Sequence, residues 1–137
     1  MQELVGKKVL AVNFDHEEHH FIQFKTEEGN FLYYTYGECC SHSYFTDIKG
    51  VSSLIGHIVI SVDKVVLPVV IDNEEDMEHI QAYGYNMKTT GGYVNFVFHN
   101  ESNGYYGGSL DLVENLEDWE IKHGCNSLKP LIEDFSQ

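Results

Sequence analysis

Apolar and polar side chains alternate along most of this chain, and this period of two constrains the fold more than any other feature. The alternation is clearest in residues 93–99, where Val94, Phe96 and Phe98 share one face. Successive side chains of a strand point to opposite faces, so the pattern predicts a strand with one face in a core. Residues 31–36 are aromatic and β-branched, as strands prefer.

Turn residues divide the chain into further predicted strands. The predicted strands are residues 8–15, 20–25, 31–36, 57–64, 80–88, 93–99 and 105–113, and residues 65–71 continue the fourth of these as extended chain. The first three favour a meander. Asn103-Gly104 indicates a hairpin that pairs residues 93–99 with residues 105–113. Pro68 cannot donate to a ladder, so it predicts a bend, a bulge or an edge.

Residues 43–50 carry the one short helix signal. Ser41 or Ser43 is a suitable N-cap, and Tyr44 and Ile48 are spaced one helical turn apart. The closing glycine can adopt a left-handed conformation that ends a helix.

The expected fold class is α+β, mainly β. We expect an antiparallel sheet of about six or seven strands with one short helix after the third strand, and the pattern leaves open whether the sheet curls into a barrel. A chain of 137 residues with 42% hydrophobic residues is typical of a single domain with a substantial core. That domain is residues 1–137, with a sheet core of about 5–113 and a C-terminal extension, 114–137.

The charge distribution narrows the classes of partner. Net charge is −14, arginine is absent, and the eight lysines are scattered. Without a basic stripe, binding of nucleic acid is disfavoured, and an anionic membrane repels the chain. A basic protein partner remains open. Without a long apolar run or a signal-peptide pattern, the expected location is the cytoplasm.

The first stretch of candidate chemistry is residues 37–45. Cys40 precedes the predicted helix, whose N-terminus lowers a thiol pKa, and His42 is a possible base for Cys39 or Cys40. The alternative is structural: one cysteine packs inward and the other lies in the turn. Three cysteines, two of them adjacent, are typical of free thiols in a reducing compartment.

Zinc is a second alternative at the same stretch. His123 and Cys125 could join the cysteines and His42 as ligands. Adjacent cysteines lack the gap of two to four residues that zinc sites use, so we predict no essential metal and no cofactor.

The second stretch is residues 99–108. Gly107 and Gly108 permit a bulge or the close approach of another backbone, and Tyr105 and Tyr106 offer flat amphipathic surface. We expect residues 39–42 to lie against residues 103–106, because functional residues gather in loops. The residues expected to contact a ligand or partner are Cys39, Cys40, Ser41, His42, Ser43, Tyr44, Ser102, Asn103, Tyr105 and Tyr106.

Together the two stretches resemble an uncharacterised family of small bacteriophage and bacterial domains. That family carries a Gly-acidic-Cys-Cys-Ser-x-Ser-aromatic element, here in residues 37–45, and a Ser-Asn-Gly-Tyr-Tyr-Gly-Gly hairpin, here in residues 102–108. The resemblance covers roughly residues 5–113. It implies a phage or prophage context, and because the family has no assigned activity, no catalytic role can be carried over from it.

The expected function is therefore that of a small acidic, phage-like binding module. It acts without catalysis and engages a host protein or sequesters a small ligand, with no nucleic acid and no membrane as partner. Two alternatives stay open: a cysteine- or zinc-dependent enzyme that uses Cys39, Cys40 and His42, and a structural component of a phage. The oligomeric state is open as well.

Overall fold

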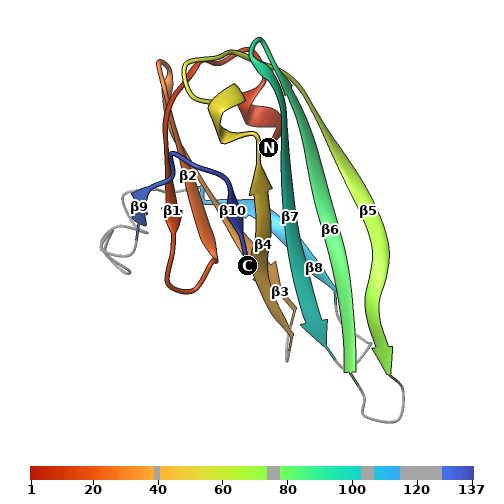
Figure 1. The fold of residues 1–137 in the computed structure, drawn as a ribbon. Helices are drawn as coiled ribbons and strands as arrows, with labels where there is room; N and C mark the ends of the chain where they lie inside the picture. Colours follow the sequence, from red (N-terminus) through yellow and green to blue (C-terminus); the bar gives the residue numbers. More distant parts are fainter. Residues whose placement is uncertain (39–40, 74–77, 103–106, 115–127) are drawn as a thin grey trace.

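Two antiparallel sheets pack face to face in the computed structural model of the chain, which describes residues 1–38, 41–73, 78–102, 107–114 and 128–137 (Figure 1). The strands are β1 (Val9–Asp15), β2 (Phe21–Thr26), β3 (Gly29–Gly37), β4 (His42–Lys49), β5 (Val59–Asn73), β6 (Glu78–Thr89), β7 (Gly92–Ser102), β8 (Gly108–Leu112), β9 (Leu128–Pro130) and β10 (Phe135–Ser136). Within the described residues, sheet 1 has the order β8-β3-β2-β1-β9 and sheet 2 the order β10-β4-β7-β6-β5.

The mainly β, antiparallel architecture confirms the coarse prediction, and two details of that prediction are wrong. The described residues form two sheets of five strands instead of one sheet of six or seven. Helical structure among them is limited to the single 3-10 turns η1 (Gln2–Leu4) and η2 (Val51–Ser53). No helix in the described part of the chain is long and apolar enough to cross a membrane.

The short helix predicted at residues 43–50 is strand β4. β4 contains a bulge, because its pairing with β7 shifts register between Phe45 and Asp47. The shift breaks the period of two, so Tyr44 and Ile48 fall on opposite faces. Gly50 does adopt the predicted left-handed conformation, with φ 89°, but it follows a strand and precedes η2.

The hairpin predicted around Asn103-Gly104 is also wrong in its pairing. β8 does not return beside β7; it pairs with β3 in the other sheet, with Gly37 opposite Gly108. The chain therefore changes sheets between β7 and β8. Residues 103–106 themselves lie outside the described residues.

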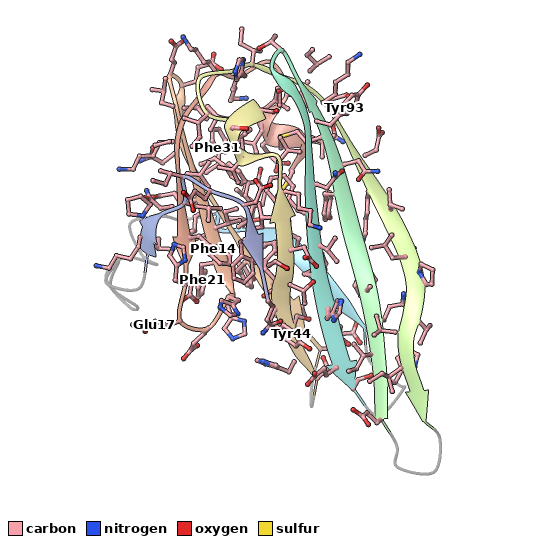
Figure 2. The ribbon with its side chains drawn as sticks, viewed as in Figure 1. Phe14, Glu17, Phe21, Phe31, Tyr44 and Tyr93 are labelled. Carbon is pink, nitrogen blue, oxygen red and sulfur yellow. The ribbon has the colours of Figure 1, made fainter. Side chains whose placement is uncertain are left out.

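Aromatic side chains from both sheets fill the core. Phe24 of β2 meets Phe96 of β7 edge to face, with ring centroids 5.9 Å apart. Phe14 of β1, labelled in Figure 2, meets Phe45 of β4 in the same way at 5.8 Å. The inward positions predicted from the alternation in β7 are confirmed, since Val94, Phe96 and Phe98 are fully buried. Burial of such rings is the main stabilising term of the fold.

The last strands attach to both sheets. β9 pairs with β1 at the edge of sheet 1, and β10 pairs with β4 at the edge of sheet 2. Between them Leu131 is buried in the core. A carboxylate oxygen of Asp134 accepts the backbone N–H groups of Gly50 and Val51 at 2.9 and 3.0 Å. The segment 128–136 therefore closes one side of the sandwich.

Candidate functional site

Buried polar side chains join the two sheets where β3 leads to β4. Asn100 of β7 is fully buried, and its Nδ2 donates to Ser43 Oγ at 2.9 Å and to Ser41 Oγ at 3.1 Å. Ser43 Oγ donates in turn to the backbone oxygen of Tyr36, 3.0 Å away. We call Ser41, Ser43 and Asn100 the Ser–Asn cluster. Asn100 Oδ1 has no hydrogen-bond partner among the described residues.

Glycines let β8 and β3 approach this cluster. A Cβ atom on Gly108 would lie 2.6 Å from Ser43 Oγ and 3.0 Å from Asn100 Cβ. A Cβ atom on its ladder partner Gly37 would lie 2.8 Å from Ser41 Oγ. The distances to the two serine hydroxyls are shorter than a real Cβ atom allows. The absence of side chains at Gly108 and Gly37 is therefore a packing requirement.

Four rings follow one another across the opposite face of β4. His42 is exposed, and its ring centroid lies 5.1 Å from that of His20 and 5.2 Å from that of Tyr44. The Tyr44 centroid lies 6.0 Å from that of His99, its ladder partner on β7. We call His20, His42, Tyr44 and His99 the ring row. Figure 2 shows Tyr44 on β4, toward the end of sheet 2 remote from Tyr93.

Hydrogen bonds fix two members of the ring row, Tyr44 and His20. Tyr44 donates its hydroxyl to Glu101 Oε1 at 2.6 Å. His20 Nδ1 lies 2.8 Å from the backbone oxygen of Ser43, which can only accept, so Nδ1 carries a proton in this contact. The Nε2 atom of the same ring is 3.7 Å from a carboxylate oxygen of Glu18.

Burial and charge set the protonation of two members of the row. Burial, followed by the hydrogen bond to Glu101, raises the pKa of Tyr44 well above its ordinary value. Burial lowers the pKa of His99 below its ordinary 6.5, although the carboxylates of Asp47 and Glu101 act in the other direction. Near neutral pH the row therefore presents a neutral phenol that is held by a carboxylate.

A family model described as a domain of unknown function (DUF7448) matches residues 2–112. The chain belongs to this family. The match confirms the expected membership of an uncharacterised family, and it ends at the last residue of β8. No curated protein and no solved structure matches the chain.

In this DUF7448 domain, the described residues that were expected to form the site separate into three groups. The serines Ser41 and Ser43 are in the Ser–Asn cluster, whereas His42 and Tyr44 belong to the ring row. Ser102 is the last residue of β7 and lies opposite His79 of β6. The others lie outside the described residues: Cys39, Cys40, Asn103, Tyr105 and Tyr106.

The two predicted stretches do meet at their described flanks. Besides the bonds from Asn100 to the serines, the backbone N–H of Glu38 donates to the oxygen of Gly107 at 3.2 Å. The bond from Glu38 places the start of the β3–β4 link beside the start of β8. His123 and Cys125, the proposed zinc ligands of the tail, lie outside the described residues, and within the described ranges no three His, Cys, Asp or Glu side chains are grouped to hold a metal ion.

Sequence reasoning missed four members of this site. His20, Asn100 and Glu101 were not among the expected residues, and neither was a fourth, His99, although the alternation of inward and outward side chains in β7 carried part of the signal. Asn100 continues the inward series of Val94, Phe96 and Phe98, so the same period of two places it in the core. A buried asparagine needs partners, and serines on the neighbouring strand are suitable ones.

Proposed function

We propose that this DUF7448 domain is a binding module that acts without catalysis and engages a protein partner through the ring row and Glu101. One observation carries the proposal: β4 alternates between a serine locked in the core and rings presented outward. The inward positions hold the scaffold, and His42 and Tyr44 are the exposed or half-buried surface. Aromatic and imidazole rings that are already fixed lose little entropy on binding.

The class of partner follows from charge and resemblance. With a net charge of −14, the chain attracts basic surfaces over long range and repels acidic ones. The resemblance to small phage and bacterial domains supports a host protein as the partner. Under this proposal Cys39 and Cys40, which precede His42 in the sequence, do not act as nucleophiles.

A capture experiment with matched tyrosine variants tests this proposal. The full chain is immobilised, and proteins retained from a bacterial lysate are quantified for the wild type, Tyr44→Ala and Tyr93→Ala. Tyr93 is the control because it lies on the same sheet with 68% exposure, at the other end (Figure 2). Tyr44→Ala should reduce capture of a specific protein by about fivefold or more, which corresponds to about 1 kcal/mol.

A third variant separates binding from folding. Tyr44→Phe keeps the ring and removes only the hydrogen bond to Glu101, so its thermal melt should stay close to that of the wild type. If Tyr44→Ala and Tyr93→Ala retain the same proteins in the same amounts, the ring row is not the binding surface.

Binding of a small ligand is the second candidate, and a cavity beside β3 and β8 favours it. Its volume is about 980 Å³, within the range of ligand sites. Its lining comprises Met1, Glu3, Phe21, Tyr33, Tyr34, Leu110, Asp111, Leu112, Val113 and Glu114. Aromatic rings with carboxylates suit a small organic cation. Burial and the charge of Asp111 raise the pKa of Tyr34, which is consistent with a negative environment.

Calorimetric titration with small amines tests this second candidate. Asp111→Asn removes one charge from the cavity wall without changing its shape. Binding that is weakened by Asp111→Asn and unaffected by Tyr44→Ala would assign the function to the cavity instead of the ring row.

A further inference from the structure

The distal half of β5, residues 65–71, exposes an apolar run at the edge of sheet 2. Val66 is 70% exposed and Val70 51% exposed, and Val69 and Ile71 are also exposed. Figure 1 shows β5 as the outermost strand of the sheet, running away from β1 and β2 toward its far end. An exposed apolar edge strand is a template for pairing with another strand.

Among the described residues, the outer backbone groups of β5 have hydrogen-bond partners near the start of the strand but, with one exception, not along its distal half. Near its start, Val59 bonds to the backbone of Gly6 and Lys7, and the oxygen of Val62 accepts a bond from the Gln2 side chain. For residues 65–71, the one bond outside the β5–β6 ladder that involves described residues runs from Gln81 Nε2 to the oxygen of Leu67. The N-terminal segment thus closes one half of the edge and leaves the other half accessible.

We propose that residues 65–71 of β5 bind an extended, apolar and basic segment of a partner protein as an added strand. Main-chain hydrogen bonds supply the affinity in this mode, and alternate side chains supply the specificity. β5 is an edge strand of sheet 2, and β6 separates it from β7 and β4. The proposed surface is therefore distinct from the ring row.

The acidic residues of this part of the chain determine which kind of partner segment can bind. The sequence from residue 65 to residue 84 contains five Asp or Glu and neither Lys nor Arg. A basic segment is therefore attracted to this part of the chain, and an acidic one is repelled.

The same charge disfavours a second copy of the chain, because each copy brings a net charge of −14. Pro68 has no backbone N–H, and the register shifts on either side of Val69 interrupt the ladder, so any added strand pairs with the residues on either side of these interruptions.

The test uses synthetic peptides and the full-length chain. The probe is an acetylated octapeptide of alternating Lys and Val. One comparison peptide has every backbone nitrogen methylated, and another has Glu in place of Lys. Binding is measured by calorimetry, and amide hydrogen exchange of the wild type locates the site. The Lys-Val peptide should slow exchange within residues 65–71, and both comparison peptides should bind at least about tenfold more weakly.

Protein variants give an independent readout. Val70 has no partner in the β5–β6 register, so Val70→Pro should weaken the Lys-Val peptide about tenfold while sparing the ladder. Val66→Ala and Ile132→Ala form a matched pair, since both side chains are at least 70% exposed. Only Val66→Ala should weaken binding, by a few-fold, because Ile132 lies outside β5.

Several results would overturn the proposal. They are no binding of the Lys-Val peptide, equal binding of the methylated peptide, or slowed exchange confined to other strands. Light scattering that shows a dimer of the wild type, lost in Val70→Pro, would assign the edge to a second copy instead.

Discussion

At the scale of single residues, the approach of β8 to β4 depends on one glycine. A Cβ atom at Gly108 would overlap the Ser43 hydroxyl and press on Asn100. Gly108→Ala should therefore lower the free energy of unfolding by about 1–3 kcal/mol, as overpacking does. Gly107→Ala is the control, because its Cβ atom would meet only the Tyr83 hydroxyl at 3.4 Å. Urea unfolding of both variants measures the difference, and equal losses would show that the contact is not tight.

His99 makes stability depend on pH. Its pKa in the folded chain is below the ordinary 6.5, so the unfolded chain binds the proton more readily. The stabilising contribution is present above pH 6.5 and is lost as the pH falls through the lower folded value. His99→Gln should therefore lose less stability than the wild type between pH 7.5 and pH 5.5. Urea unfolding at the two pH values measures this, and an identical loss in both proteins would contradict it.

At the scale of elements, two neighbouring residues test how the C-terminal strands are held. Leu131 is 4% exposed between β9 and β10, whereas Ile132 is 74% exposed. Leu131→Ala should cost about 2–5 kcal/mol, the range for a buried leucine. Ile132→Ala should stay within about 0.5 kcal/mol. Chemical unfolding distinguishes them, and a similar small cost for both would mean that the segment adds little to the core.

Elements with an uninterrupted period of two could be predicted from the sequence. The alternation predicted β1, β2, β3 and β7 as strands, and the predicted inward face of β7 was correct. β4 was mistaken for a helix because Tyr44 and Ile48 are spaced one helical turn apart in the sequence, whereas the bulge puts their side chains on opposite faces of the strand. Local patterns carry no information about such a shift, which arises from pairing with β7.

The pairing of β8 was beyond local reasoning for a different reason. Asn-Gly predicts a hairpin because it suits a tight turn between neighbouring strands. The partner of a strand, however, depends on which edge it can reach. Gly37 and Gly108 let β8 lie against β3, and this contact between residues distant in sequence is not visible in either segment alone. The same crossing joins the two halves of the candidate site.

At the scale of the whole molecule, the two surfaces lie on different strands of sheet 2. The ring row runs across β4 and β7, and the exposed edge is β5, with β6 between β7 and β5. The cavity that favours a small ligand lies elsewhere, along β3 and β8. The three candidate sites are therefore separable by mapping which side chains become protected on binding.

Hydroxyl-radical footprinting of the full chain with a captured protein tests the central claim most directly. The claim is that the ring row is the contact surface of a binding module. On complex formation, oxidation of His42 and Tyr44 should fall severalfold, and oxidation of Tyr93, at the far end of the same sheet, should not change. Unchanged oxidation of Tyr44, together with protection of Phe21 and Tyr34 at the cavity, would contradict the claim.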